Sequence, residues 1–217
     1  MSSTPRTRGA RKSPTERAAE IAGAARDLAL AEGLSAVTLR SVAARIGVAP
    51  GLVAHYEPAM DALVAASFRS VVSTELDEMR AVIAGAPTPT AALAALLAAL
   101  LDGTRDDVTV VWVEAWAMGR RNETLAAAVR AEMDAWQGVV KAIVDDGVHV
   151  GEFQVTDAAT ADVAWQLLGM IDGLNAQALV RWNDERSRGS VLHRAVEGML
   201  GLDRFTLDRA GDPAAGD

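Results

Sequence analysis

Residues 38–56, TLRSVAARIGVAPGLVAHY, contain the pattern that decides the fold. Four apolar residues recur at spacings of three and four, which is typical of one face of a short helix over 39–46. They are Leu39, Val42, Ala43 and Ile46. Gly47 follows, and glycine readily adopts the left-handed conformation at which helices end. Pro50 suits the first turn of a second helix, so the stretch predicts a helix-turn-helix whose second helix enters the major groove of DNA.

The polar and small residues of this motif indicate how it would contact DNA. Thr38 can cap the first helix and offer its hydroxyl to a phosphate, while Arg40 lies in the first turn. The second helix carries few hydrogen-bonding groups, so base recognition would depend on backbone amides and apolar contacts with thymine methyl groups. The candidate DNA-binding residues are Thr38, Arg40, Ser41, Ala49, Pro50, Gly51, Leu52, His55 and Tyr56. An ordinary helical hairpin in an all-α protein is the alternative interpretation.

Several residues of this region resemble the DNA-binding domain of TetR-family transcriptional regulators. The resemblance is carried by Gly33, by residues 38–43 (TLRSVA) and by residues 47–53 (GVAPGLV). The continuation over 54–56 (AHY) is most similar to the BetI-like, choline-responsive branch of that family. The resemblance implies an all-α homodimer with an N-terminal DNA-binding domain and a larger C-terminal domain that binds a small effector. It implies a repressor that the effector releases from its operator.

Two positions after the motif depart from the family pattern. The family usually has an aromatic residue and a lysine where this chain has Glu57 and Met60. That lysine commonly contacts a phosphate at the start of the next helix. The departure supports an alternative interpretation, in which the chain is a dimeric helical sensor of small molecules with weak or lost DNA binding.

Composition and charge are consistent with two domains of different character. The chain has 217 residues, is 50% hydrophobic and has no cysteine, which excludes disulfides and thiolate metal sites and fits a cytoplasmic protein. The net charge is −8, but it is distributed unevenly. Residues 1–69 carry nine Lys and Arg against six Asp and Glu, whereas residues 70–217 carry twelve against twenty-three. A basic N-terminal part on an acidic body is the asymmetry expected of a DNA-binding protein.

Neither a membrane protein nor an enzyme is indicated. The N-terminus is charged without an apolar segment, and the longest apolar run, 91–101, is shorter than the roughly 20 residues that span a bilayer. The three histidines, His55, His149 and His193, are widely separated, and no phosphate-binding glycine-rich loop is present. We therefore expect no catalysis, no cofactor, no metal ion and no membrane partner.

The remaining pattern predicts an all-α protein of about nine helices. Residues 1–12 are expected to form a flexible arm, 13–57 the helix-turn-helix domain, 58–203 the ligand-binding and dimerisation domain, and 204–217 a flexible tail. Residues 13–16 (SPTE) combine an N-cap serine, a first-turn proline and a capping-box glutamate, so the first helix should begin there.

Tryptophans in the C-terminal part predict an effector site. Trp112 and Trp116 are four residues apart and share a helix face, and Trp165 and Asp172 share another. An aromatic wall with a carboxylate can hold a small organic cation, as choline recognition requires, and a hydrophobic metabolite is also compatible. The candidate ligand-binding residues are Trp112, Glu114, Trp116, Trp136, Trp165, Asp172 and Asn175. Alternatively, the tryptophans are ordinary core residues.

Two apolar stripes near the C-terminus predict a dimer interface on the helices expected at 157–182 and 188–201. The family resemblance implies that these two helices pair with their mates in a four-helix bundle. The candidate interface residues are Leu168, Ile171, Ala178, Leu179, Val191, Leu192, Ala195, Val196 and Met199. A dimer would present two recognition helices to the half-sites of a palindromic operator. The alternative is that the stripes are internal core.

Overall fold

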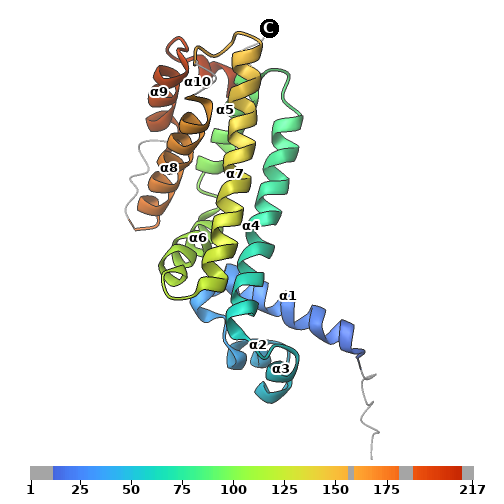
Figure 1. The fold of residues 1–217 in the computed structure, drawn as a ribbon. Helices are drawn as coiled ribbons and strands as arrows, with labels where there is room; N and C mark the ends of the chain where they lie inside the picture. Colours follow the sequence, from blue (N-terminus) through green and yellow to red (C-terminus); the bar gives the residue numbers. More distant parts are fainter. Residues whose placement is uncertain (1–11, 156–158, 181–187, 212–217) are drawn as a thin grey trace, which may run out of the picture.

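The computed structural model describes residues 12–155, 159–180 and 188–211, and these form an all-α fold (Figure 1). The described residues contain ten α-helices and one short 3₁₀ helix, where the sequence predicted about nine helices. They are α1 (Pro14–Glu32), η1 (Leu34–Ala36), α2 (Leu39–Arg45), α3 (Pro50–Tyr56), α4 (Met60–Ala84), α5 (Pro89–Leu101), α6 (Asp106–Gly119), α7 (Glu123–His149), α8 (Thr160–Ala178), α9 (Arg188–Leu200) and α10 (Thr206–Gly211).

Helix α1 begins where the sequence predicted. The Ser13 hydroxyl accepts a hydrogen bond from the backbone N–H of Glu16 at 3.2 Å, and the Glu16 carboxylate accepts one from the backbone N–H of Ser13 at 2.7 Å. This reciprocal pair satisfies donors that a helix start leaves open. Lys12 forms an ion pair with Glu20. The rest of the predicted arm, 1–11, lies outside the described residues.

The two longest helices of the described residues, α4 and α7, lie side by side and pack against each other in the larger domain (Figure 1). Helix α4 also packs against α1, so it belongs to both parts of the molecule. Large apolar side chains that are less than 2% exposed, among them Phe68, Leu97 and Leu125, fill the space between the helices. No helix within the described ranges is long and apolar enough to cross a membrane.

The C-terminal end differs from the flexible tail expected over 204–217. Residues Thr206–Gly211 form α10, and the Leu207 side chain is completely buried. The Glu197 carboxylate of α9 accepts hydrogen bonds from the backbone N–H groups of Phe205 and Leu207, at 3.1 and 3.0 Å. These contacts hold α10 against the body of the protein, and α10 packs on α5 and α9. Residues 212–217 lie outside the described residues.

Candidate functional site

Helices α2 and α3 form the predicted helix-turn-helix at one end of the molecule (Figure 1). Thr38 caps α2, because its hydroxyl accepts a hydrogen bond from the backbone N–H of Ser41 at 3.2 Å. Gly47 has a φ of 68°, which lets the chain turn between the helices. Pro50 occupies the first turn of α3, and the Val53 side chain of the same helix is completely buried. The structure confirms these local predictions.

The candidate DNA-binding residues differ in how freely they reach solvent. The six exposed residues are Thr38, Arg40, Ala49, Pro50, Gly51 and His55. The three half-buried residues are Ser41, Leu52 and Tyr56. Arg40 forms no ion pair with another described residue, so its guanidinium is available to a phosphate. The Ser41 hydroxyl is engaged within the motif, since it accepts from the backbone N–H of Thr38 at 3.0 Å and donates to the carbonyl of Ala36. Ser41 therefore supports the start of α2.

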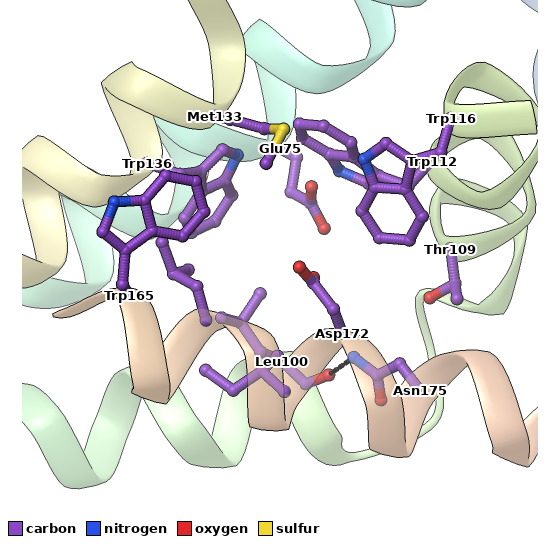
Figure 2. A pocket seen from close by; sticks show the side chains of 12 residues that line it. Glu75, Leu100, Thr109, Trp112, Trp116, Met133, Trp136, Trp165, Asp172 and Asn175 are labelled. Carbon is purple, nitrogen blue, oxygen red and sulfur yellow. Dashed lines mark hydrogen bonds between the residues drawn. The ribbon is translucent and has the colours of Figure 1, made fainter. Parts of the chain in front are cut away.

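A cavity of about 60 Å³ lies between five helices of the larger domain (Figure 2). Its walls contain four tryptophans that the sequence singled out. Helix α6 supplies Trp112 and Trp116, α7 supplies Trp136, and α8 supplies Trp165 together with Asp172. The remaining lining residues are Glu75, Leu100, Thr109, Met133, Leu168, Ile171 and Asn175.

Two carboxylates face each other across this cavity. Figure 2 shows Glu75 of α4 and Asp172 of α8 pointing toward one another. Burial raises the pKa of Glu75 to about 7, although a hydrogen bond from the Trp112 indole and the charge of Arg105 act in the opposite direction. Burial also raises the pKa of Asp172 to about 6. Both shifts follow mainly from burial, which disfavours the ionised form of a carboxyl group.

Aromatic rings enclose the carboxylates. The ring centroids of Trp112 and Trp116 are 5.7 Å apart, and Phe68 packs edge-on against Trp112 at 5.0 Å. Trp136 is 5% exposed, whereas Trp165 is 44% exposed and forms the outer edge of the cavity. The faces of indole rings attract cations, so walls of this kind suit a positively charged ligand. The buried indole N–H groups of Trp116 and Trp136 find no acceptor among the described residues.

Asn175 lines the cavity, but its amide is already engaged. Its side-chain N–H donates to the carbonyl of Leu100 at 2.9 Å, and its oxygen accepts from Arg188 at 3.2 Å. Arg188 is 8% exposed and also pairs with Asp106 at 2.9 Å. Asn175 of α8 therefore connects this helix to α5 and α9 by hydrogen bonds. Asn175 lines the cavity, but its polar groups stabilise the packing of these helices.

Glu114 lies outside the cavity, although the sequence grouped it with the ligand-binding residues. It sits two positions from both Trp112 and Trp116 on α6, so it projects from a different side of the helix. Its carboxylate accepts hydrogen bonds from the backbone N–H of Ser35 at 2.8 Å and from the Ser35 hydroxyl at 3.1 Å. Glu114 therefore connects α6 to η1 of the N-terminal domain.

Four candidate dimer residues are turned into the protomer. Leu168 and Ile171 line the cavity, and Leu192 and Val196 are 2% and 0% exposed in the core. Helices α8 and α9 bury one side against their own protomer, and an apolar stripe does not reveal which neighbour it faces. Of the other candidates, Val191 and Ala195 are exposed and three are half-buried: Ala178, Leu179 and Met199.

Sequence reasoning missed Glu75, the second carboxylate of the cavity. A signal for it exists, because Glu75 interrupts the apolar stripe of α4. The buried neighbours in that stripe are Val71, Val72, Leu76 and Met79. An acidic residue on the buried face of a helix is costly unless it serves a partner or a ligand. Thr109, Met133 and Leu100 carried no comparable signal.

Two family models match the chain. The model described as the C-terminal domain of BetI-type transcriptional repressors matches residues 89–201. The model of the tetR family of bacterial regulatory proteins matches residues 21–67. No curated protein matches the chain closely enough to count as a relative.

Solved structures share the fold across most of its length. A transcriptional regulator from Saccharomonospora viridis in complex with choline is 19% identical with a TM-score of 0.71, covering 86% of this chain and 96% of that one. A TetR transcription regulator from Haloarcula marismortui is 22% identical with a TM-score of 0.70, covering 86% and 97%. A TetR-family regulator from Rhodococcus sp. is 19% identical with a TM-score of 0.68, covering 86% and 99%.

Proposed function

Because the chain belongs to the TetR family of transcriptional regulators, with a C-terminal domain of the BetI type, we propose that it represses transcription and is released from its operator by a small organic cation. Regulators of this family bind DNA operators, dimerise and bind small effectors, and the chain is accordingly a ligand-responsive DNA-binding regulator. The family implies a regulator and not an enzyme. Its place of action would be the cytoplasm, where the operator lies.

The observation that supports a cationic effector is the pair of carboxylates within the aromatic cavity. A hydrophobic metabolite would leave Asp172 without a hydrogen-bond donor among the described residues and Glu75 with the Trp112 indole alone, which is costly for buried carboxyl groups. A cation would be attracted both by the carboxylates and by the faces of the surrounding indoles. The choline complex of the Saccharomonospora viridis neighbour adds support, since that protein has a similar fold.

We propose that α6 carries the signal between the two domains. The same helix supplies Trp112 and Trp116 to the cavity and holds η1 through the contact of Glu114 with Ser35. An effector shifts the regulator away from DNA only if it binds the released conformation more tightly than the operator-bound one. A cation that repositions the tryptophan face of α6 would meet this condition by moving Glu114 relative to Ser35.

The proposed regulator is a homodimer that reads a palindromic operator. The exposed residues Val191 and Ala195 on α9, together with half-buried Met199, offer a surface for pairing. Two recognition helices at a suitable separation could then engage half-sites about 34–36 Å apart, with Arg40 on the phosphates. A Val191→Glu variant should convert the dimer to a monomer in light scattering, because like charges would meet across the two-fold axis. Retention of the dimer would remove this surface from the proposal.

Tryptophan fluorescence tests the cationic effector directly, because four of the five tryptophans line the cavity. Choline and smaller amines should change the emission of the purified protein in a saturable manner. The double variant Glu75→Gln, Asp172→Asn should lose this response while keeping its helical circular dichroism. A short aliphatic alcohol of the same size is the matched neutral ligand. A stronger response to the alcohol than to every cation would contradict the proposal.

A further inference from the structure

We infer that the cavity selects a protonated amine that keeps N–H groups on its cationic nitrogen, held jointly by the carboxylates of Glu75 and Asp172, in preference to a fully methylated ammonium. The inference rests on the proposed function, since it names the class of cation that the same cavity would take. It departs from the choline seen with one structural neighbour, because choline has no N–H group.

The two carboxylates have few hydrogen-bond donors around them in the described part of the chain. Asp172 accepts no hydrogen bond from any described residue, and Glu75 has the Trp112 indole as its donor. An ionised carboxylate has about four acceptor positions, so most positions of this pair remain open. A protonated primary amine offers three donors, whereas a quaternary ammonium offers none. Charge-assisted hydrogen bonds are about twice as strong as neutral ones, so the N–H groups would carry much of the affinity.

The two carboxylates also converge on one place. They come from opposite walls, α4 and α8, and Figure 2 shows them directed toward each other within the cavity. An ammonium group between them could donate to both at the roughly 2.7–2.9 Å typical of N⁺–H···O⁻ contacts. Methyl groups would hold the nitrogen farther away, because a carbon approaches an oxygen only to about 3.3 Å. The attraction falls with distance, so each added methyl group weakens it.

Charge balance within the cavity favours a ligand with one positive charge. Beyond Asp172, Glu75 faces Arg105 and Glu78, which pair with each other at 2.7 Å, so Arg105 is shared between two acids. Burial favours the protonated form of either carboxyl group, so one ammonium and one proton would together balance the pair. A monocation is thus sufficient. The cavity of about 60 Å³ has room for roughly four to six water-sized groups, which limits the ligand to a compact amine.

The aromatic walls do not choose between these ligands. Cation–π attraction acts on methylated and unmethylated ammonium groups alike, so the indoles would favour both classes. The distinction depends on the carboxylates alone. Substitutions at Glu75 and Asp172 should therefore weaken the binding of amines with N–H groups more than they weaken the binding of choline.

A methylation series isolates the number of N–H groups. Ethanolamine, N-methylethanolamine, N,N-dimethylethanolamine and choline share one chain and one hydroxyl, and they differ in the N–H groups on nitrogen. Calorimetric titration of the full-length protein should show affinity falling along the series, with ethanolamine at least about tenfold tighter than choline. Choline binding as tightly as ethanolamine would overturn this inference and leave the proposed function intact. Absence of binding by all four would overturn both.

Isosteric variants then assign the preference to the carboxylates. Asp172→Asn and Glu75→Gln should each reduce the ratio of ethanolamine affinity to choline affinity toward one. Asp77→Asn, on the exposed side of α4, is the matched control and should leave the ratio unchanged. Circular dichroism and unfolding midpoints identify any variant that has lost its fold, and the ratio is then taken from the other isosteric variant. A ratio unaffected in a folded variant would overturn joint binding.

Discussion

The Glu114 carboxylate of α6 accepts two hydrogen bonds from Ser35 of η1, from the backbone N–H at 2.8 Å and from the hydroxyl at 3.1 Å. The two residues are 79 positions apart and belong to different domains. Trp112 and Trp116 line the cavity and lie on the same helix as Glu114. The contact therefore connects the tryptophan-lined cavity to the helix-turn-helix domain through one helix, α6.

Glu114→Ala should uncouple effector binding from operator release. Loss of hydrogen bonds to a charged acceptor should lower the free energy of unfolding by about 1–3 kcal/mol. The affinity for an amine should stay within about twofold, because Glu114 does not line the cavity. The ratio of operator affinities without and with saturating amine should fall at least about fivefold. Ser35→Ala, which keeps the backbone N–H, should show a smaller loss, and an unchanged ratio in Glu114→Ala would contradict the role of this contact.

Gly33→Ala should destabilise the protein at the same junction. Gly33 has a φ of 86°, and a Cβ atom there would lie 2.7 Å from a Glu114 carboxylate oxygen. Backbone strain of this kind costs on the order of 1–3 kcal/mol, and Glu114 would also have to leave Ser35. Urea unfolding measures the change. Gly23→Ala is the matched control, since a Cβ there meets open space within α1 and should stabilise by about 0.5–1 kcal/mol. Equal effects of the two substitutions would contradict this account.

Glu75→Gln should change how stability depends on pH. The pKa of Glu75 is raised from 4.5 to about 7, so the folded protein binds this proton more tightly than the unfolded chain does. The contribution of Glu75 to wild-type stability should therefore fall as pH rises from about 4.5 to 7, whereas the variant lacks this contribution. Relative to wild type, the variant should gain up to about 3 kcal/mol between pH 4.5 and pH 8. Urea unfolding at both pH values measures it, with Asp77→Asn as the control. Parallel profiles for wild type and variant would refute a buried, proton-binding Glu75.

Arg40→Ala should weaken DNA binding about equally for operator and scrambled DNA. Arg40 is exposed in the first turn of α2, where a guanidinium would contact a phosphate without reading sequence. The slope of log affinity against log salt should become shallower by about one unit. Fluorescence anisotropy at several salt concentrations measures both quantities. Arg130→Ala, at an exposed site on α7, should match wild type, and an unchanged slope in Arg40→Ala would remove Arg40 from the phosphate contacts.

Local signals explain what could be predicted from the sequence. The caps of α1 and α2, the turn at Gly47 and the first-turn Pro50 depend on residues within four positions of each other. Helical spacing also placed Trp112 beside Trp116, and both line the cavity. Such features need no knowledge of distant parts of the chain, because backbone conformation and helix periodicity decide them.

Long-range packing explains what could not be predicted. The partner of Glu114 is in another domain, and only the packing of α6 against η1 reveals it. Leu168 and Leu192 belong to apolar stripes, and such a stripe has the same sequence pattern on a dimer surface, a cavity wall or a core. In the structure, both side chains face their own protomer. Leu207 is buried, and its backbone N–H donates to the Glu197 carboxylate ten residues earlier, a contact that the polar composition of the chain end does not indicate.

An amine bound between Glu75 and Asp172 should release this regulator from DNA. The most direct measurement is the fluorescence anisotropy of labelled DNA from upstream of its own gene, titrated with the protein in the absence and presence of saturating ethanolamine. We expect the wild-type protein to bind this DNA more tightly than scrambled DNA. Ethanolamine should weaken that binding at least tenfold in wild type. It should leave the binding unchanged in the double variant Glu75→Gln, Asp172→Asn. Operator affinity that is the same with and without every amine of the methylation series would contradict release by an amine.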